Sequence, residues 1–471
     1  MRLSLDRLWL ILAIALPALV CLLVPIPAVD LAYQVRAGDA ILRTGLIPAV
    51  DTYTFTVAGT PWMDQQWLAQ VLLALGFRAG GWELLVVLRA ALVSASFGLL
   101  AATAMARGAR ARTASILSLI AFALAAPALA LRPQLFAIAT FSLLLLLVAR
   151  RHRNPRLVWL APLLVIAWAN IHGSFVLAPM LLGYAWLDDL VRGRPARASF
   201  LLLVVGTAAT VINPFGVGVW AYAAGIGANP AISGQATEWQ RTTPFTVPGL
   251  LFYISAAAAL ALAMRGRAAL RWPDWLWLAA MFAIGVWAVR GLAWWPFGAV
   301  LVLGGLPDAL WPASRVRGAA RASRPPAVVA VLLGVMVVAA LPWWRPADPI
   351  TGRTGILSYA PSGIAAELRT LAPAGTRVLA AQTWTSFLEW AVPDARYFLD
   401  SRFELFPAEV WADRETIVAG GPDADAALAG LGVELLVLPA GTDLGLTGWT
   451  VAYEDADGAI LTRDKKAQPG T

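Results

Sequence analysis

The sequence predicts an all-α polytopic membrane domain of about eleven transmembrane helices, followed by a small extracytoplasmic α/β domain. Three observations indicate this fold class. Hydrophobic residues make up 59% of the chain, whereas charged residues make up only 14%. The mean hydropathy is +0.70, which is more apolar than a soluble domain can bury. After Trp343, Asp, Glu, Gly and Pro become frequent and the apolar runs shorten.

Long apolar runs predict the membrane spans, because a helix needs roughly 20 apolar residues to cross the hydrocarbon. The expected spans are Leu8–Val29, Trp82–Ala106, Ala114–Leu131, Gln134–Ala149, Leu157–Ile171, Phe175–Leu190, Phe200–Ile212, Gly249–Ala263, Trp275–Val289, Trp295–Leu306 and Ala327–Leu341. The first run is too long for the core of a signal peptide and no clear cleavage site follows it, so we expect it to be retained. The shorter apolar run Trp67–Gly81 is typical of a helix that lies in the membrane interface.

Arginine tracts predict the orientation of the spans. They occur at every second turn of the chain, and the positive-inside rule places them in the cytoplasm together with the N-terminus. The tracts are Arg107–Arg112, Arg150–Arg156, Arg192–Arg197, Arg265–Arg271 and Arg315–Arg324. The net charge of +8 is explained by these tracts, so we expect no nucleic-acid partner. The expected location is the cytoplasmic membrane, with the other loops and everything after Pro342 outside.

Composition also predicts the domain boundaries. We expect a transmembrane domain at 1–345 with a long first outside loop at 30–81, an extracytoplasmic α/β domain at 346–464, and a loose tail at 465–471. In the outer domain we expect helices at Gly363–Leu371, Trp384–Trp390 and Ala424–Leu431, strands at Arg377–Ala381, Tyr397–Leu399 and Val433–Pro439, and a hairpin formed by Trp449–Tyr453 and Ala459–Thr462. The chain has a single cysteine, Cys21, so no disulfide can form within it.

The stretch Asp30–Trp67, between the first two spans, is the first group of candidate functional residues. We interpret it as a loop that forms the working face of the protein. It gathers four carboxylates and two arginines in a chain with few charges: Asp30, Asp39, Asp51 and Asp64, with Arg36 and Arg43.

The other outside loops supply a second group of candidates. These polar residues come from distant parts of the chain: Arg132, Asn170, His172, Glu238 and Arg290. Asn213 and Arg241 lie in the same loops, and we give them no role. Arg132 and Arg290 lie at span ends outside the arginine tracts, where an ionisable group is a functional candidate by default. Arginines that converge on one pocket suit an anionic head group such as a phosphate, and a nearby carboxylate suits a general base.

Each candidate also has a purely structural explanation. Asp30 can cap a helix, Asp51 can form an Asx turn and Asp64 can be a solvated N-cap. Arg132 can extend to lipid phosphate, and His172 can pack within a turn.

Some charged groups are expected to be structural only. His152 lies in a basic tract and is expected at the surface. The pair Asp188–Asp189 falls at the cytoplasmic end of a span, so we do not interpret it as a metal site. Asp400, Arg402 and Glu404 are expected to form a surface ion network. The sequence has no Walker loop, HExxH or CxxC motif, so nucleotide-driven transport and zinc hydrolysis have no support.

Local patterns in the chain resemble a known superfamily. They are D-x-x-x-x-x-R-x-G at Asp30–Gly38, I-P-x-x-D-x-Y-x-F-T at Ile47–Thr56, P-W-x-D-x-x-W-L at Pro61–Leu68, RPQ at Arg132–Gln134, WANIHGSF at Trp168–Phe175, NPFG at Asn213–Gly216, EW at Glu238–Trp239 and FLDSR at Phe398–Arg402. Together with the acidic residue at the exit of the first span and the soluble outer domain, the chain resembles the GT-C membrane glycosyltransferases. Within that superfamily it is similar to the uncharacterised bacterial branch described as RgtA/B/C/D-like or family 39-like.

The resemblance implies transfer of a sugar from a polyprenyl-phosphate donor to an acceptor hydroxyl on the outer face. The acceptor class is a glycan, a lipid or a protein. The implied catalytic carboxylates are Asp30 and, second, Asp51. The implied phosphate-binding residues are Arg36, Arg132 and Arg290. Further substrate contacts are assigned to Gln34, Asp64, Gln66, Asn170, His172 and Glu238, and a divalent cation is allowed but not required.

The chain departs from the pattern of this group at two places. The group often has histidine where Gln34 stands, and His-Glu where Gln65–Gln66 stands, so an acid–base or metal role is weakened there. The alternative function is a non-catalytic membrane scaffold or a transporter of a lipid-linked envelope component. A transporter needs polar groups along a path through the bilayer, whereas the spans here are nearly pure Ala, Leu and Val, with Arg89 as the main exception.

Overall fold

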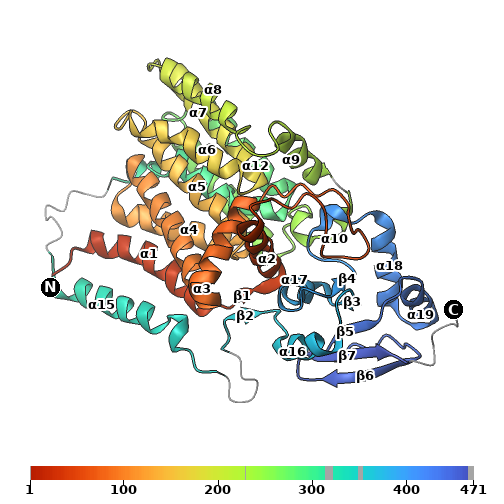
Figure 1. Ribbon diagram of the computed structural model, residues 1–471. Helices are drawn as coiled ribbons and strands as arrows, with labels where there is room; N and C mark the ends of the chain where they lie inside the picture. The colour runs from red at the N-terminus through yellow and green to blue at the C-terminus, as the bar shows by residue number, and fades with distance from the viewer. Residues whose placement is uncertain (1, 229, 313–321, 348–353, 465–471) are drawn as a thin grey trace. The chain divides into compact units, whose positions relative to one another are not determined.

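The computed structural model describes residues 2–228, 230–312, 322–347 and 354–464 (Figure 1). The predicted tail at 465–471 and most of the basic tract Arg315–Arg324 lie outside these residues. The chain forms two compact units. Unit 1 contains residues Met1–Val24, Gly80–Gly227 and Ala236–Arg345, and unit 2 contains residues Pro25–Ala79, Ala228–Gln235 and Pro346–Thr471. The predicted first outside loop is therefore grouped, up to Ala79, with the C-terminal residues.

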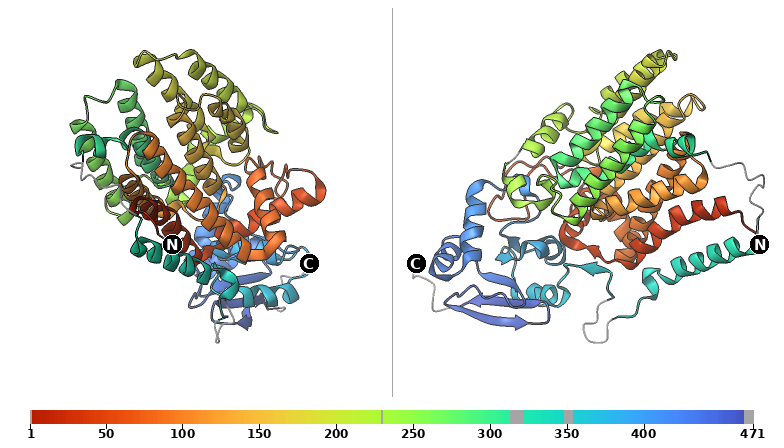
Figure 2. Two further views of the ribbon diagram at one scale, coloured as in Figure 1. Left: turned by 90° about the vertical axis from the view of Figure 1, so that its left-hand side faces the viewer. Right: turned by 180° about the vertical axis from the view of Figure 1, so that it is seen from behind.

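Unit 1 is built from helices. Its elements are α1 (Leu5–Leu23), the second half of α3 (Trp67–Ala106), α4 (Ala111–Ala125), η1 (Ala126–Ala128), α5 (Pro133–Ala149), η2 (Leu157–Leu160), α6 (Ala161–Ala169), η3 (Gly173–Val176), α7 (Leu177–Val191), α8 (Arg197–Ala209), α9 (Gly218–Ala228), η4 (Thr237–Trp239), α11 (Val247–Arg265), α12 (Trp272–Trp287), η5 (Val289–Ala293), α13 (Trp295–Leu303), α14 (Leu306–Leu310), α15 (Arg324–Ala339) and η6 (Pro342–Trp344). Helices α5, α6, α7 and α8 pack side by side, and α1 packs between α4 and α15 (Figures 1 and 2).

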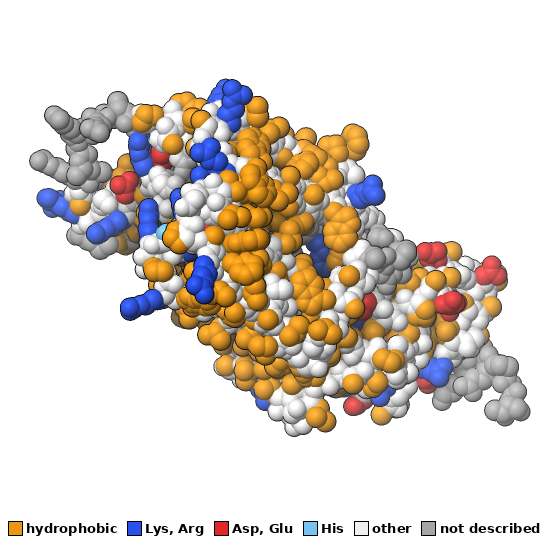
Figure 3. Space-filling view, turned by 90° about the horizontal axis from the view of Figure 1, so that it is seen from above, with side chains coloured by type: hydrophobic (Ala, Val, Ile, Leu, Met, Phe, Trp, Pro, Cys, Tyr) orange, Lys and Arg blue, Asp and Glu red, His pale blue; other side chains and the backbone are white. Residues whose placement is uncertain are grey.

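Every predicted span overlaps an apolar helix of unit 1. Within the described residues, six helical segments are long and apolar enough to cross a membrane, whereas α5, η2–α6, α8 and α15 are apolar but shorter. The number of helices that cross the bilayer therefore stays a prediction. Large apolar side chains such as Ile254 on α11 and Val335 on α15 are more than half exposed. Figure 3 shows hydrophobic side chains over much of the visible face, as expected for a surface in contact with lipid.

Two glycines mark the boundary between the predicted interfacial helix and the second span. The helix α3 is kinked at Gly80 and Gly81, whose backbone dihedrals are not helical. Gly81 has a φ of 65°, in the region that favours glycine. The kink confirms the predicted end of the Trp67–Gly81 segment.

The first span is shorter than predicted. Helix α1 ends at Leu23 instead of Val29, because Pro25 and Pro27 follow it and a proline disfavours a helical conformation in the residue before it. Residues Ile26–Pro27 form the short strand β1.

Unit 2 mixes helices and strands. Its elements are β1 (Ile26–Pro27), α2 (Ala28–Thr44), the first half of α3, α10 (Pro230–Gln235), β2 (Leu357–Ser358), α16 (Ser362–Leu371), β3 (Arg377–Ala380), α17 (Gln382–Ala391), β4 (Arg396–Tyr397), η7 (Phe403–Leu405), α18 (Ala408–Ala419), α19 (Gly421–Gly430), β5 (Leu435–Pro439), β6 (Trp449–Glu454) and β7 (Gly458–Arg463). The main sheet has the strand order β4-β3-β5-β7-β6. Strands β4, β3 and β5 are parallel, and β5, β7 and β6 are antiparallel.

The outer-domain elements predicted from periodicity are confirmed, with shifts of a few residues at their ends. The helix α18 was not predicted, although Val410, Trp411 and Ile417 bury one side of it.

The interpretation of Asp30–Trp67 as a loop is wrong for its first part. Residues Ala28–Thr44 form the helix α2, which ends at Gly45 in the left-handed conformation, a common helix stop. Helix α2 packs on α17, where the backbone N–H of Tyr33 donates to Ser386 Oγ at 2.9 Å. The charged residues of the stretch interrupt its apolar pattern, and this interruption concealed the helix.

Gly38 allows α2 to approach the start of α3 closely. A Cβ atom at this position would lie 2.0 Å from the backbone oxygen of Gln70, so a side chain cannot fit without moving one helix. We expect Gly38→Ala to lower the free energy of unfolding by about 1–3 kcal/mol, as overpacking does elsewhere. The matched control is Gly183→Ala in α7, where the nearest atom lies 4.0 Å away. Thermal unfolding of both purified variants should show a loss only for Gly38→Ala.

Candidate functional site

A polar cavity lies in unit 1 where three chain segments meet. It has a volume of about 50 Å³, and its polar lining consists of Arg132, Gln134, Glu238 and Arg290. Arg132 precedes α5 as its N-cap residue, Glu238 belongs to η4 and Arg290 belongs to η5. The rest of the lining is apolar, and the side chains of Arg132, Arg290 and Glu238 are 28%, 22% and 38% exposed.

Glu238 bridges the two arginines of the cavity. Its Oε2 atom lies 2.9 Å from Arg132 Nη1, and its Oε1 atom lies 3.6 Å from Arg290 Nη1. Burial raises the pKa of the Glu238 carboxyl, but Arg290 and Arg132 outweigh burial and hold this pKa below its ordinary value. The Arg290 guanidinium also lies 4.6 Å from the centroid of the Trp239 ring, a favourable cation–π distance.

His172 lies beside Arg290. Its Nδ1 atom lies 2.8 Å from Ser174 Oγ and 3.1 Å from the backbone nitrogen of Ser174. Its Nε2 atom lies 3.4 Å from Arg290 Nη2. Burial and the charge of Arg290 lower the pKa of His172 well below its ordinary value, so the ring is neutral. His172 does not line the cavity itself and is a neighbour of Arg290.

Asn170 does not line this cavity. Its side-chain amide donates to the backbone oxygens of Ile166 and Ile212, at 2.8 and 2.9 Å. These bonds join the end of α6 to the segment after α8. The geometry therefore explains Asn170 as a residue that fixes the chain near His172.

Unit 2 contains a separate cluster of buried charges around Arg402. Arg402 Nε donates to Asp400 Oδ2 at 2.9 Å, and Nη2 pairs with Asp51. The guanidinium lies 4.7 Å from the centroid of the Tyr53 ring and 4.6 Å from that of Trp62. Arg402 is 1% exposed. The prediction of a surface ion network at Asp400 and Arg402 is therefore wrong, because the residues around them are aromatic and close over the charges.

Asp51 forms the Asx turn that its surroundings suggested. Its carboxylate accepts the backbone N–H groups of Tyr53 and Thr54 at 3.2 and 3.1 Å, and the Thr54 hydroxyl at 2.7 Å. With the additional pair to Arg402, Asp51 is fully engaged in holding the segment that follows Pro48. These contacts favour a structural role.

Arg36 is similarly engaged by the chain itself. Its guanidinium donates to the backbone oxygens of Glu389 and Pro393, at 2.8 and 3.0 Å, and lies 4.3 Å from the Tyr53 ring centroid. These contacts fasten α2 to α17 and to the turn that follows it. Asp30 lies in the first turn of the same helix, where the helix dipole favours a carboxylate.

Gln34, Gln66 and Asp64 lie where α2 meets the start of α3. Gln34 Nε2 donates to Gln66 Oε1 at 2.9 Å and to Tyr33 Oη at 2.6 Å. Asp64 accepts from Gln70 Nε2 at 2.7 Å and is only 2% exposed. The interpretation of Asp64 as a solvated N-cap is therefore wrong, because the helix–helix contact encloses its carboxyl group.

Solved structures were found that share this fold. The oligosaccharyltransferase of Archaeoglobus fulgidus, solved with an acceptor peptide, matches with a TM-score of 0.60 at 12% identity, over 98% of this chain and 74% of that one. ArnT from Cupriavidus metallidurans in its apo state matches with a TM-score of 0.52 at 15% identity, over 98% of both chains. Both are glycosyltransferases of the GT-C superfamily. This chain has the GT-C fold. No family model matches it, and no curated protein matches its sequence.

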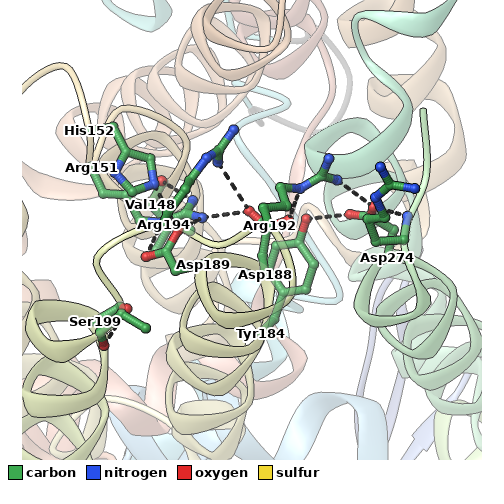
Figure 4. A network of polar contacts seen from close by, with 12 residues as sticks. Val148, Arg151, His152, Tyr184, Asp188, Asp189, Arg192, Arg194, Ser199 and Asp274 are labelled. Atoms are coloured by element: carbon green, nitrogen blue, oxygen red, sulfur yellow. Dashed lines mark hydrogen bonds and ion pairs between the residues drawn. The ribbon is translucent and has the colours of Figure 1, made fainter.

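The GT-C fold of this chain includes a second buried ion network, at the other end of α5 and α7 (Figure 4). Arg151 bridges Asp188 and Asp189. Arg192 pairs with Asp188, and its Nη2 atom lies 2.7 Å from Asp274 Oδ2. Because α5 has 17 residues between Arg132 and this network, the two clusters are about 25 Å apart along the helix. The second network therefore ties helix ends together and does not extend the cavity.

His152 is exposed, as predicted, and it also contacts the network. Its Nε2 atom lies 2.8 Å from Asp189 Oδ1, and its side chain is 41% exposed. The ring therefore lies at one edge of the network in Figure 4. Asp188 and Asp189 are paired with arginines.

Two features of this fold were not predicted from the sequence. Gln134 was noted only as part of a motif, yet it lines the cavity and donates to the backbone oxygen of Arg290 at 3.4 Å. Glu389 is fully buried, and burial together with the nearby Asp400 raises the pKa of its carboxyl well above its ordinary value. Glu389 stood out weakly in the sequence, because the polar residues Thr385 and Ser386 precede it by one turn of α17. Among the described residues, no group of His, Cys, Asp and Glu is arranged to hold a metal ion, so we assign no step to one.

Asp64 makes the stability of the fold dependent on pH. Burial raises the pKa of its carboxyl from 3.8 to about 7, so the folded protein holds a proton there that the unfolded chain loses above pH 4. The proton on Asp64 therefore stabilises the fold fully below pH 3.8, the pKa in the unfolded chain. This contribution to the free energy of unfolding is lost as the pH rises through about 7, the pKa in the folded protein. We expect Asp64→Asn to flatten the fall in melting temperature between pH 4 and pH 7. The control is the partly exposed Asp39→Asn, which should retain the wild-type slope.

Proposed function

We propose that this chain is an integral membrane glycosyltransferase that moves a sugar from a polyprenyl-phosphate donor to an acceptor hydroxyl on the outer face of the cytoplasmic membrane. The single observation that carries the proposal is the cavity that Arg132 and Arg290 line together, because it brings two cations from distant parts of the chain to one small space. Guanidinium groups are suited to a phosphate.

The ligands of the structural neighbours support the same class of donor. ArnT was solved bound to undecaprenyl phosphate, with a TM-score of 0.50. The archaeal oligosaccharyltransferase AglB was solved with a dolichol-phosphate and an inhibitory peptide, with a TM-score of 0.59. Both ligands are lipids that carry a phosphate. By analogy we propose a lipid-linked sugar as the donor, and a glycan, lipid or protein as the acceptor.

In the proposed reaction, the bond between the anomeric carbon of the sugar and the phosphate oxygen breaks. The oxygen of the acceptor hydroxyl forms the new bond to that carbon, and the electron pair of the broken bond stays on the phosphate. Arg132 and Arg290 stabilise the charge that develops there, because their ion pairs with Glu238 fix them before the reaction begins. The hydroxyl proton goes to a carboxylate general base, for which we propose Asp30.

Asp30 is preferred to Asp51 because of the contacts that Asp51 makes and the partial exposure of Asp30. Asp51 accepts three hydrogen bonds from its own turn and pairs with buried Arg402, so a role as base would break the turn. Asp30 is partly exposed in the first turn of α2, and a partly exposed carboxylate can exchange protons with the solvent.

The alternative of a transporter is less well supported. Arg89, the charged residue expected in a span, donates to the backbone oxygens of Leu129 and Val24, at 2.9 and 3.1 Å. These oxygens lie at the ends of η1 and α1, where carbonyl groups lack helical partners. Arg89 is therefore explained as a helix-end cap, and it does not indicate a polar path through the bilayer.

The proposal is tested by incubating the purified full-length protein with a radiolabelled polyprenyl-phosphate sugar in membrane extracts that contain acceptors. We expect loss of the lipid-linked sugar with wild-type protein, and a loss of activity of about 10²-fold or more with Asp30→Asn, the usual range for a missing general base. The control is Asp39→Asn, which removes a carboxylate of the same helix. An unchanged rate with Asp30→Asn would exclude Asp30 as the base.

A further inference from the structure

The buried ion network of Figure 4 ties three loops of unit 1 together. Arg151, in the loop between α5 and η2, pairs with Asp188 near the end of α7. Arg192, which directly follows α7, pairs with Asp274 at the start of α12, and it also donates to the backbone oxygen of Ala269 at 3.5 Å. The α5–η2, α7–α8 and α11–α12 loops therefore adjoin one another at this end of the helices.

The carboxylates at these loops point inward and are paired. The network contains three aspartates whose side chains are 0–2% exposed: Asp188, Asp189 and Asp274. Three arginines offset their charge: Arg151, Arg192 and Arg194. Residues 150–160, 190–200 and 265–275 contain no Asp or Glu besides Asp274. On α14, which contacts α11, Asp308 is already paired with Arg110. The acidic groups at this place are thus used within the fold.

The same loops and the first residue of α8 carry six further arginines, all of them exposed. We call these side chains the basic face: Arg150, Arg153, Arg156, Arg197, Arg267 and Arg271. Over the part of the chain that the structure describes, none of the six forms an ion pair with a carboxylate. Like charges on adjoining loops repel one another, so an anionic partner that covers the basic face stabilises the folded protein.

Large apolar side chains lie directly beside the basic face. Leu157 and Trp159 follow Arg156 and are 51% and 43% exposed, and Trp272 follows Arg271 and is 53% exposed. Tryptophan next to arginine is typical of the membrane interface, where the ring contacts acyl chains at the level of the head groups. A nucleic acid or an acidic protein offers the face its charge. A phospholipid offers a phosphate to the arginines and also an acyl chain to the neighbouring rings.

We propose that the basic face binds anionic phospholipids of the leaflet that adjoins it, with their phosphodiester groups on the arginines and their acyl chains against η2 and the start of α12. This inference is independent of the proposed function, because the face lies at the opposite end of α5 from Arg132 and its ligand is a lipid of the bilayer, which is not consumed. Arginine suits such a ligand, because its guanidinium group donates two parallel N–H groups to phosphate oxygens.

The test uses the full-length protein in a neutral detergent. It is titrated with dioctanoyl phosphatidylglycerol, which is anionic, or with dioctanoyl phosphatidylcholine, which has no net charge, and the dissociation constants are measured by calorimetry. Each arginine near an anionic lipid surface contributes about fivefold in affinity. We therefore expect the wild-type protein to bind phosphatidylglycerol about tenfold or more tightly than phosphatidylcholine, and about 1 M NaCl to remove this preference.

A double variant and a matched control locate the site. Arg153→Gln combined with Arg156→Gln should weaken phosphatidylglycerol binding by about tenfold or more. Arg43→Gln combined with Arg241→Gln removes two exposed arginines outside the basic face and should keep the wild-type affinity. Thermal unfolding establishes that both double variants are folded.

Three outcomes would overturn the inference. Equal binding of the two lipids by the wild-type protein contradicts it, and this comparison decides even if the double variant does not fold. An equal loss of affinity in the control contradicts it as well, because the lipid would then respond to total charge. Polyglutamate that binds as tightly as phosphatidylglycerol would assign the basic face to an acidic protein.

Discussion

Replacing Arg402 by methionine is expected to lower the free energy of unfolding by about 3–5 kcal/mol, the range for breaking a buried ion pair. Methionine is unbranched and apolar, so the variant removes the charge and the guanidinium while keeping the first part of the side-chain stem. Asp51 and Asp400 would then be buried without their cation, and the contacts of Arg402 with Tyr53 and Trp62 would be lost. Lysine should not rescue the variant, because it cannot replace the planar guanidinium that lies over the Tyr53 and Trp62 rings and pairs with two carboxylates.

The measurement is thermal unfolding of the purified protein in detergent, monitored by tryptophan fluorescence. The matched control is Arg43→Gln, which breaks the ion pair with Asp39 on α2, where the Arg43 side chain is 67% exposed. Exposed pairs contribute about 0–1 kcal/mol, so this control should unfold close to the wild-type temperature. If Arg402→Met unfolds at the same temperature as the control, the cluster does not stabilise the fold in the way described.

Removing either cation of the cavity should strongly slow sugar transfer. We expect Arg132→Gln and Arg290→Gln each to lower the rate of sugar transfer by about 10²-fold or more, the range measured when one fixed donor to a developing charge is lost. Each single variant also leaves the cavity without net positive charge, since Glu238 stays in place. Binding of undecaprenyl phosphate, measured by calorimetry, should weaken in parallel with activity.

The control for these variants is Arg241→Gln. Arg241 is exposed and lies three residues after Glu238, so this variant removes the same charge from the same region without touching the cavity. We expect its activity and binding to match the wild type. Equal losses in all three variants would indicate a general electrostatic effect of the surface, and would contradict a specific phosphate site.

The helices of unit 1 were predictable because the length and polarity of an apolar run are properties of the local sequence. Every predicted span overlaps a helix, and the two glycines at 80 and 81 stop the preceding helix as expected. The helix α2 was missed for the same reason. Its residues Asp30, Arg36 and Asp39 interrupt the apolar pattern, and only packing against α17 shows that Leu31, Val35 and Ile41 face the interior.

The candidate site was predictable only in part. The sequence identified Arg132, Glu238 and Arg290 as unusual charges at span ends, but it contained no information about which of them pair. Arg36 and Asp51 were candidates on the same grounds, as charged residues in an outside segment. In the structure, Arg36 contacts backbone carbonyl groups and Asp51 contacts a buried arginine. The difference between these two groups of residues lies in their partners.

The sequence by itself determined that this chain forms many apolar helices followed by a mixed α/β region, because hydrophobicity and periodicity act over a few turns. Only the tertiary structure decided the pairing of charges. Arg132 and Glu238 are 106 residues apart and meet at 2.9 Å, and Asp51 meets Arg402 across 351 residues. Burial strengthens such pairs by lowering the local dielectric constant, and burial is set by the packing of the whole fold.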